Sequence, residues 1–357
     1  MRALTALGGD PDPMFDVDLL GLGPLGNREE AEEFSRFTEG AVLEFRIHGA
    51  GECAGKVRTA EQWQREPQAA TVALQPLLSI KRVAESPPQP LPPAARPLDG
   101  IRVLDLTRVL AGPTCSKSLA EHGAEVLKIS AAHLPDSGLV ELDTGMGKRT
   151  SRLDLRNENE VSILKDLVRD ADVFVQSYRP GTLGARGFSP EQLAALRPGI
   201  IVASLSAWGE TGPWSHRRGF DSIVQAVSGI AHANGDGQKP RLLPVSAIDY
   251  ISGYLMAFGV CVALGRRARE GGSWLVQVSL ARVGKWIVDR GEVDEAAYRA
   301  QPADLPAGEL AALFGEMDAP DGRIRYLKPV LALSETPPHF ARPPVPLGYH
   351  QPVWTSG

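Results

Sequence analysis

An acidic residue stands near the start of the longest apolar stretch of this chain. The stretch LLPVSAIDYISGYLMAFGVCVALGRR, residues 242–267, carries one carboxylate, Asp249. An Asp that precedes an apolar-periodic segment can cap a helix by accepting hydrogen bonds from its first backbone N–H groups. A carboxylate held near an apolar wall can instead serve as a nucleophile. The residue type alone leaves both roles open.

The segments that would position this acid alternate between strand and helix. The expected strands are IRVLDL, AEVLKIS, DVFVQSY and GIIVASLS, and the expected helices between them are TCSKSLAEHG, ENEVSILKDLVRD and SPEQLAAL. Repeated β-α-β units of this size predict an α/β fold, a mostly parallel sheet covered by helices. Ligands of such sheets bind beyond the carboxyl ends of the strands. We therefore expect a site at the loops TRVLAGPTC, SYRPGTLGARGF and SAWGETGPWSHRRGFD.

A proline-rich stretch, ESPPQPLPPAARPLDG, separates this pattern from the residues before it. Its composition favours an extended chain and predicts a linker over residues 86–99. We predict a small α+β segment over 1–85, the α/β domain over 100–285 and a C-terminal segment over 286–357. Within 1–85 the expected helices are NREEAEEFSRF and TAEQWQREPQ, and the expected strands are AVLEFRI and LLSIKRV.

Composition excludes several classes of protein. The 357 residues are 43% apolar, which is typical of a folded core, and the formal net charge of −5 argues against nucleic acid as a partner. Cys53, Cys115 and Cys261 lack the paired spacing of a metal site, so we expect reduced thiols, no metal and a cytoplasmic location. The first residues lack the apolar length of a signal peptide. The apolar run 248–264 contains an Asp and ends in GRRARE, which indicates a buried helix and no membrane span.

One glycine motif is misleading. GLGPLG, residues 21–26, has the spacing of a dinucleotide-binding turn, and Glu44 follows at a suitable distance. The next residues, NREEAEEF, would place four glutamates where a pyrophosphate must bind, and like charges repel there. We interpret these glycines as an ordinary turn.

Four collinear blocks between about Pro97 and Leu280 resemble the family III CoA transferases, a group that also contains the alpha-methylacyl-CoA racemases. The blocks are PLDGIRVLDLTRVLAGPTCSKSLAEHGAEVLKI, DVFVQSYRPGTLGARGFSPEQLAALRPGIIVASLSAWGETGPW, RRGFDSIVQAVSG and AIDYISGYLMAFGVCVAL. The resemblance implies a Rossmann-like domain, acyl-CoA and a small carboxylic acid as substrates, no tightly bound cofactor, and a homodimer. It also implies that Asp249 is the nucleophile, which forms an aspartyl anhydride and then an aspartyl-CoA thioester.

The same resemblance implies residues that bind coenzyme A. Lys148 and Arg149 stand where the family has an Asn-x-Lys-Arg-Ser-like stretch, although isolated basic residues are more often solvated surface charges. The other implied residues follow the first and third strands of the α/β pattern: Arg108, Ala111, Gly112, Tyr178, Arg179 and Gly181. The glycine-rich stretch ANGDGQKP, residues 233–240, is a candidate source of oxyanion donors, with an exposed hairpin turn as the alternative.

Two other functions compete with the transferase. A racemase of this family carries a histidine base where this chain has Phe220, and His216 or His232 would have to replace it. The third candidate is a non-catalytic CoA-binding partner subunit, because the layout is atypical. VRTAEQWQREPQ resembles the end of the family's small domain yet precedes the Rossmann-like part, as in the latter part of a duplicated or rearranged transferase.

Ser130 stands where the family commonly has an acid, and Ala185 where it usually has an arginine, with Arg186 one residue later.

Overall fold

The computed structural model describes residues 40–49, 52–91, 93–134, 138–302, 304–331 and 333–355. These residues form two compact units. The first unit contains the described residues up to Leu77, Ser206–Asp249 and Ser279–Arg290. The second contains the described residues of Leu78–Leu205, Tyr250–Val278 and those from Gly291 onward. This grouping differs from the four consecutive segments predicted from the sequence, because each unit is assembled from stretches that are distant along the chain.

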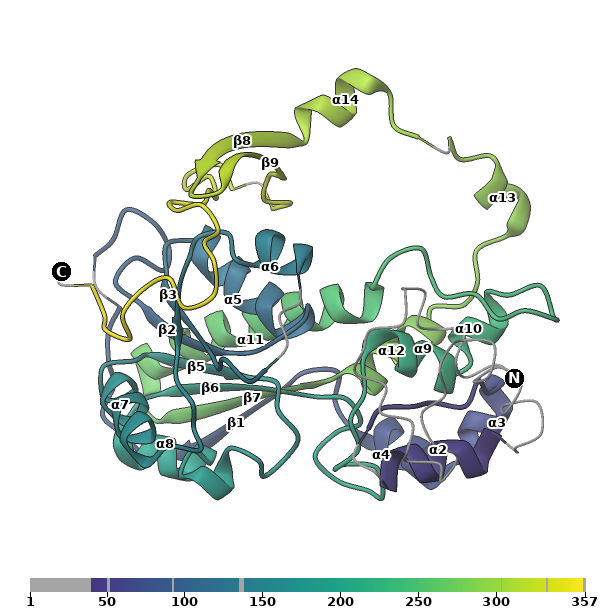
Figure 1. Ribbon diagram of the computed structural model, residues 1–357, viewed down its shortest axis with the longest axis horizontal. Coiled ribbons are helices and arrows are strands. Elements are labelled where there is room, and N and C mark those ends of the chain that lie inside the picture. The colour runs from purple at the N-terminus through teal and green to yellow at the C-terminus, as the bar shows by residue number, and fades with distance from the viewer. Residues whose placement is uncertain are drawn as a thin grey trace. The chain divides into compact units, whose positions relative to one another are not determined.

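A seven-stranded sheet organises the second unit (Figure 1). Its strand order is β1-β7-β6-β5-β2-β3-β4, and β2 (Arg102–Leu106) pairs in parallel with both β3 (Glu125–Ser130) and β5 (Val173–Gln176). The parallel pairs continue outward to β4 (Lys148–Arg152) and β6 (Ile201–Ser206). The α/β prediction is confirmed. Because the chain moves outward from β2 in both directions, the topological switch point lies between β2 and β5.

The predicted strands β2, β3, β5 and β6 are present, and LLSIKRV forms β1 (Ser79–Ala84). Strand β1 pairs antiparallel with β7 (Ser273–Ser279), so the end of the predicted N-terminal segment belongs to the same sheet as β2. Strands β4 and β7 were not predicted. The sequence of β4, KRTSR, has no apolar residue to signal a buried strand.

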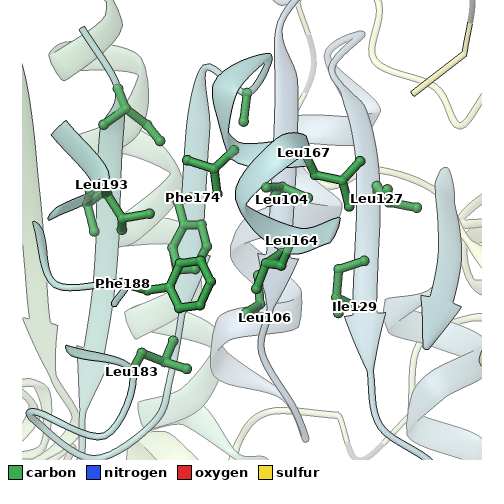
Figure 2. Close-up of a cluster of buried hydrophobic side chains, with 14 of the residues drawn as sticks. Leu104, Leu106, Leu127, Ile129, Leu164, Leu167, Phe174, Leu183, Phe188 and Leu193 are labelled. Atoms are coloured by element: carbon green, nitrogen blue, oxygen red, sulfur yellow. The ribbon is translucent and has the colours of Figure 1, made fainter. Parts of the chain in front are cut away.

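Helices cover both faces of this sheet. Leu104 and Leu106 point to one face, where they pack with Leu164 and Leu167 of α7 and Leu193 of α8 (Figure 2). The alternate residue Asp105 points to the other face and meets α5 through Ser116. The helix bounds in this unit are α5 (Ala111–Glu121), α6 (Leu139–Thr144), α7 (Glu158–Arg169), η3 (Gly184–Arg186), α8 (Pro190–Leu196) and α11 (Ala247–Glu270).

The apolar run 248–264 is part of the helix α11, as predicted, but its predicted burial is incomplete, because Tyr254 and Phe258 are exposed. Among the described helices, α11 has the length and composition of a membrane span, but half of its apolar window is buried inside the fold. Its glycines allow close packing: a Cβ atom at Gly259 would lie 2.5 Å from the Val276 side chain, and one at Gly253 would lie 2.5 Å from the Ala111 carbonyl oxygen. The core helix of a globular domain has these properties.

The first unit is helical. It contains α2 (Gly40–Gly49), α3 (Ala60–Gln64), α4 (Pro67–Leu74), α9 (Asp221–Val227), α10 (Ile230–Ala233), α12 (Leu280–Val288) and the first residues of α11. AVLEFRI, predicted as a strand, is part of α2; its Glu44 is buried in an ion pair with Arg58. TAEQWQREPQ forms α3 and the start of α4. GLGPLG and NREEAEEFSRF lie outside the described residues.

The proline-rich stretch contains no helix or strand among its described residues, as expected, but it connects β1 to β2 within one sheet. Gln89 donates its backbone N–H to the Arg267 carbonyl (3.1 Å), Gly272 donates to the Ser86 carbonyl (3.0 Å), and Leu98 is buried. The stretch is therefore packed against the second unit and does not separate two domains.

The C-terminal residues form an extended arm and a return segment. The arm carries α13 (Glu295–Arg299), α14 (Ala307–Ala312) and the hairpin of β8 (Phe314–Ala319) and β9 (Gly322–Leu327) (Figure 1). The return segment joins the sheet region through Gly147 N–H to the Arg342 carbonyl (2.9 Å) and His350 N–H to the Thr150 carbonyl (2.8 Å). Residues 333–355 thus help to hold the β4 edge.

Candidate functional site

Asp249 lies in the first turn of α11 and is 7% exposed. Within the described part of the chain its carboxylate accepts no hydrogen bond, and Asp221 is the one charged group that perturbs it. A buried polar group without a partner is unfavourable and is rarely retained for stability alone. This arrangement does not match a helix cap.

Asp221, at the start of α9, caps α11 instead. Its Oδ2 accepts the backbone N–H of Asp249 (3.1 Å), and the backbone N–H of Ile248 also bonds to this carboxylate. Its Oδ1 accepts a hydrogen bond from Gln225 Nε2, and Gln225 Oε1 accepts the Leu243 backbone N–H (2.8 Å). Sequence reasoning overlooked Asp221, because a cap supplied from another helix leaves no local spacing signal.

The two carboxyls change each other's acidity. Burial, reinforced by the nearby Asp221, raises the pKa of Asp249 from 3.8 to about 8. Burial also raises the pKa of Asp221, although its three hydrogen-bond donors oppose this effect. The Asp249 carboxyl therefore holds its proton at neutral pH and ionises in mildly alkaline solution. Such a displaced titration is frequent at functional sites.

In the second unit, the switch point brings together most of the predicted coenzyme A residues. Arg108, Ala111 and Gly112 follow β2, whereas Tyr178, Arg179 and Gly181 follow its parallel neighbour β5. Burial raises the pKa of Tyr178, and the nearby Arg108 lowers it, so these two loops lie next to each other. The expectation that both loops meet at one edge of the sheet agrees with the structure.

The loop after β2 has a constrained backbone. Val109 has φ +64°, a left-handed conformation that is costly for a β-branched residue, and such strain clusters at functional sites. A Cβ atom at Gly112 would lie 2.5 Å from the Thr107 side chain, so only glycine fits at this turn. The backbone at the start of α5 is thereby fixed beside the end of β2.

A cavity of about 130 Å³ opens beyond the carboxyl ends of β2, β3 and β5. Apolar side chains such as Leu106 and Leu183 form its walls, and Ser130, His133, Tyr178 and Arg186 supply polar groups. Both Ser130 and Arg186 were noted from the sequence as departures from the family pattern. The cavity residue His133 was missed, because it lies in a loop without a recognisable motif.

Lys148 corrects a prediction. It is fully buried, and its Nζ donates to Asp105 Oδ2 (2.9 Å), the Pro113 carbonyl (2.9 Å) and Ser116 Oγ (2.7 Å). All three of its protons are therefore used inside the protein, and none is left for a phosphate of coenzyme A. Lys148 is a structural ion-pair partner, neither a ligand contact nor a solvated charge.

Arg149 is engaged in a similar way. Its Nη1 donates to the Val353 carbonyl (2.6 Å) and lies 3.4 Å from Glu125 Oε1, and its side chain is buried. These contacts tie β4 to β3 and to the C-terminal return segment. The predicted phosphate contact is not supported for this residue either.

The remaining candidates lie in the first unit. The stretch ANGDGQKP forms an exposed turn that Asp236 closes by accepting the backbone N–H groups of Gln238 and Lys239 (3.0 and 2.7 Å), which matches the hairpin alternative. Phe220 directly precedes Asp221 and is 47% exposed. His216 and His232 are exposed, and among the described residues neither perturbs Asp249. The structure offers no histidine base in the racemase position.

Comparison with known proteins identifies the family. The model of CoA-transferase family III matches residues 98–313, more than half of the chain, so the chain belongs to this family. An acetyl-coenzyme A transferase of Hypoxylon pulicicidum, nodX, is 38% identical over 211 residues, which are 57% of this chain and 36% of the relative. An acetyl-CoA:oxalate CoA-transferase of Acetobacter aceti is 36% identical over 197 residues, which are 52% of this chain and 51% of the relative.

A solved structure shares the fold. Rv3272 of Mycobacterium tuberculosis, in its orthorhombic crystal form, has a TM-score of 0.63 and 23% identity, and the match covers 71% of this chain and 98% of that chain. At this identity the likeness concerns the fold alone. The chain spans about a third to a half of the length of the two curated relatives it matches here.

We predict that Lys148→Met destabilises the protein by about 3–5 kcal/mol, because removing one partner leaves the Asp105 carboxylate buried and unpaired. Urea unfolding measures this loss. Lys239→Met, at an exposed lysine of the 233–240 turn, is the matched control and should change stability by less than about 1 kcal/mol. A Lys148→Met protein of normal stability that no longer binds coenzyme A would return Lys148 to the ligand site.

A second prediction concerns pH. The unfolded chain releases the Asp249 proton near pH 3.8, whereas the folded protein keeps it to about pH 8. Between these values the folded state binds more protons, so this residue lowers the free energy of unfolding as the pH rises. Asp249→Asn removes the effect: the variant should match the wild type at pH 4 and exceed it at pH 8 by on the order of a few kcal/mol. Equal stability at pH 8 in urea unfolding would contradict the raised pKa.

Proposed function

We propose that this member of CoA-transferase family III moves coenzyme A between an acyl-CoA thioester and a free carboxylic acid, with Asp249 as the nucleophile. The observation that carries the proposal is the buried Asp249 carboxyl, held at the start of α11 without a hydrogen bond from the described residues. A helix cap would be bonded to the backbone, but Asp221 fills that role. Asp249 is therefore available for chemistry.

The proposed reaction needs the ionised form of Asp249. One carboxylate oxygen attacks the thioester carbonyl and expels the coenzyme A thiolate, which leaves a mixed anhydride. The thiolate then attacks the aspartyl carbonyl and releases the donor acid, so that an aspartyl-CoA thioester remains. The acceptor acid repeats the two steps in reverse order and restores Asp249. The overall reaction replaces one thioester by another of similar energy, so no nucleotide hydrolysis is required.

The nucleotide end of coenzyme A is proposed to bind in the second unit at the switch point. The supporting features are the cavity beyond β2, β3 and β5, the constrained loop at Val109 and the adjacent Arg108 and Tyr178. Arg179 and Gly181 belong to the same turn after β5, and Gly181 has φ +80°, which favours glycine. Lys148 and Arg149 support this site from within the sheet and make no ligand contact in the proposal.

A homodimer is the proposed assembly. Helices α13 and α14 have five and six residues, and α14 buries none of them. Helices this short are unstable in water without packing. Tyr298 is 69% exposed, and Leu310 is also exposed, so the arm presents apolar side chains that a second copy of the chain would cover.

We predict that incubation with mixed acyl-CoAs and free acids yields exchanged thioesters, detected by mass spectrometry. Asp249→Asn should abolish transfer and keep coenzyme A binding, because the nucleotide is held by other residues and an amide cannot form the anhydride. Hydroxylamine trapping should place the acyl group on the peptide that contains Asp249. A fully active Asp249→Asn protein would refute the nucleophile. Deuterium incorporation from heavy water at the α-carbon of a 2-methylacyl-CoA, without the formation of exchanged thioesters, would identify a racemase.

For the assembly, we predict that light scattering after gel filtration gives the mass of two chains. Tyr298→Asp combined with Leu310→Asp should give the mass of one chain, because charged groups on both short helices oppose the burial of the arm. Leu74→Asp, at an exposed leucine of α4, is the matched control and should leave the dimer intact. A wild-type monomer at concentrations of tens of micromolar would exclude the homodimer.

A further inference from the structure

Asp221 makes the contacts of a helix cap, and it also faces a second carboxyl. We infer that Asp221 is a positioning residue for Asp249: its carboxylate fixes the first turn of α11 through two backbone N–H groups and places a second buried acidic group beside the Asp249 carboxyl. The inference rests on the proposed function, because the ionised Asp249 is the form that attacks a thioester.

The geometric part depends on a short chain of buried groups. Asp221 receives backbone N–H groups from two successive residues of α11, and its other oxygen is held by Gln225. Asp221 and Gln225 are buried, and they lie one helical turn apart on α9. Gln225 is fixed in turn by the Leu243 N–H in the approach to α11. The position of Asp249 is thus fixed through its own backbone, and its side chain accepts no hydrogen bond from the described residues.

The electrostatic part follows from the same placement. A negative charge close to a buried acid disfavours ionisation of that acid. Among the described residues, Asp221 is the one titratable group that affects Asp249, and no lysine, arginine or histidine there offsets it. The hydrogen-bond donors around Asp221 favour its charged form, and Asp249 has no such donors among the described residues, so a proton is held more readily by Asp249 than by Asp221. Asp221, which accepts hydrogen bonds, is therefore the acid of the pair that ionises more readily, and Asp249 is the one that stays protonated to higher pH.

A direct test separates charge from position. A hydrophobic carbodiimide reacts with protonated carboxyls, and peptide mapping reports its addition to Asp249 as a function of pH. In the wild type, labelling should fall by half near pH 8. In Asp221→Asn the midpoint should move down by on the order of one pH unit, because the amide can still accept a backbone N–H but carries no charge. The rise of transfer rate with pH should move by the same amount.

Asp221→Glu tests the position. It retains the charge, so the labelling midpoint should stay within a few tenths of a pH unit of the wild type. The added methylene displaces the first turn of α11, and the maximal transfer rate should fall on the order of a hundredfold. The control is Asp294→Asn, the same change at the cap of α13, where Asp294 accepts the Ala297 N–H (3.0 Å) and faces no reactive acid. It should change neither profile.

The outcomes distinguish the two proposals. If Asp221→Asn leaves the pH midpoints of labelling and of transfer rate unchanged, as Asp294→Asn should, the positioning role is overturned. If the labelling midpoint shifts as expected but the wild type transfers no coenzyme A, the proposed function fails while the charge coupling of the pair is retained. If Asp221→Asn does not fold, an unchanged labelling midpoint in Asp221→Glu still supports the charge component, and a lowered midpoint overturns it.

Discussion

The buried ion pair between Lys148 and Asp105 holds the candidate ligand edge of the sheet together. Lys148 belongs to β4 and Asp105 to β2, so the pair spans the intervening strand β3. Ser116 and the Pro113 carbonyl complete the cluster and tie α5 to both strands. Burial alone would raise the pKa of Asp105, but Lys148, Lys128 and the hydroxyls hold it below its usual value. The turn from β2 to α5, with its strained Val109, depends on this cluster for its shape.

Asp249 in the first unit has the opposite environment. Asp105 is surrounded by donors, whereas Asp249 has none among the described residues and faces Asp221. A buried acid without donors lowers stability in the pH range where the unfolded chain is ionised. Proteins retain such unfavourable groups mainly where chemistry needs them. The contrast between two buried aspartates of one chain is therefore a stronger indication of function than the burial of either one.

Much of the fold could be predicted because its strands are apolar and separated by helices of ordinary length. IRVLDL, AEVLKIS, DVFVQSY and GIIVASLS show this pattern and form β2, β3, β5 and β6. Two of the failures have a common cause. KRTSR became a strand through the buried pairing of Lys148, and AVLEFRI became a helix whose Glu44 pairs with Arg58. Tertiary ion pairs of this kind override local propensity and leave no periodic signal.

The residues of the candidate site likewise fall into those that the sequence predicts and those that it does not. Asp249 and the loop residues around Arg108 and Tyr178 stand out because motif and topology agree, whereas Asp221 and His133 depend on contacts between distant stretches. At the cavity, Ser130 ends β3 without the negative charge that the family commonly has there. Asp154 is paired with Arg156 and His133. Arg186 donates to the Leu155 carbonyl and forms no ion pair with a carboxylate of the described residues. The cavity lining thus carries Arg156 and Arg186 against the carboxylate of Asp154, a charge balance that supports the proposed binding of the nucleotide end of coenzyme A here, even though the arginine position of the family is shifted by one residue.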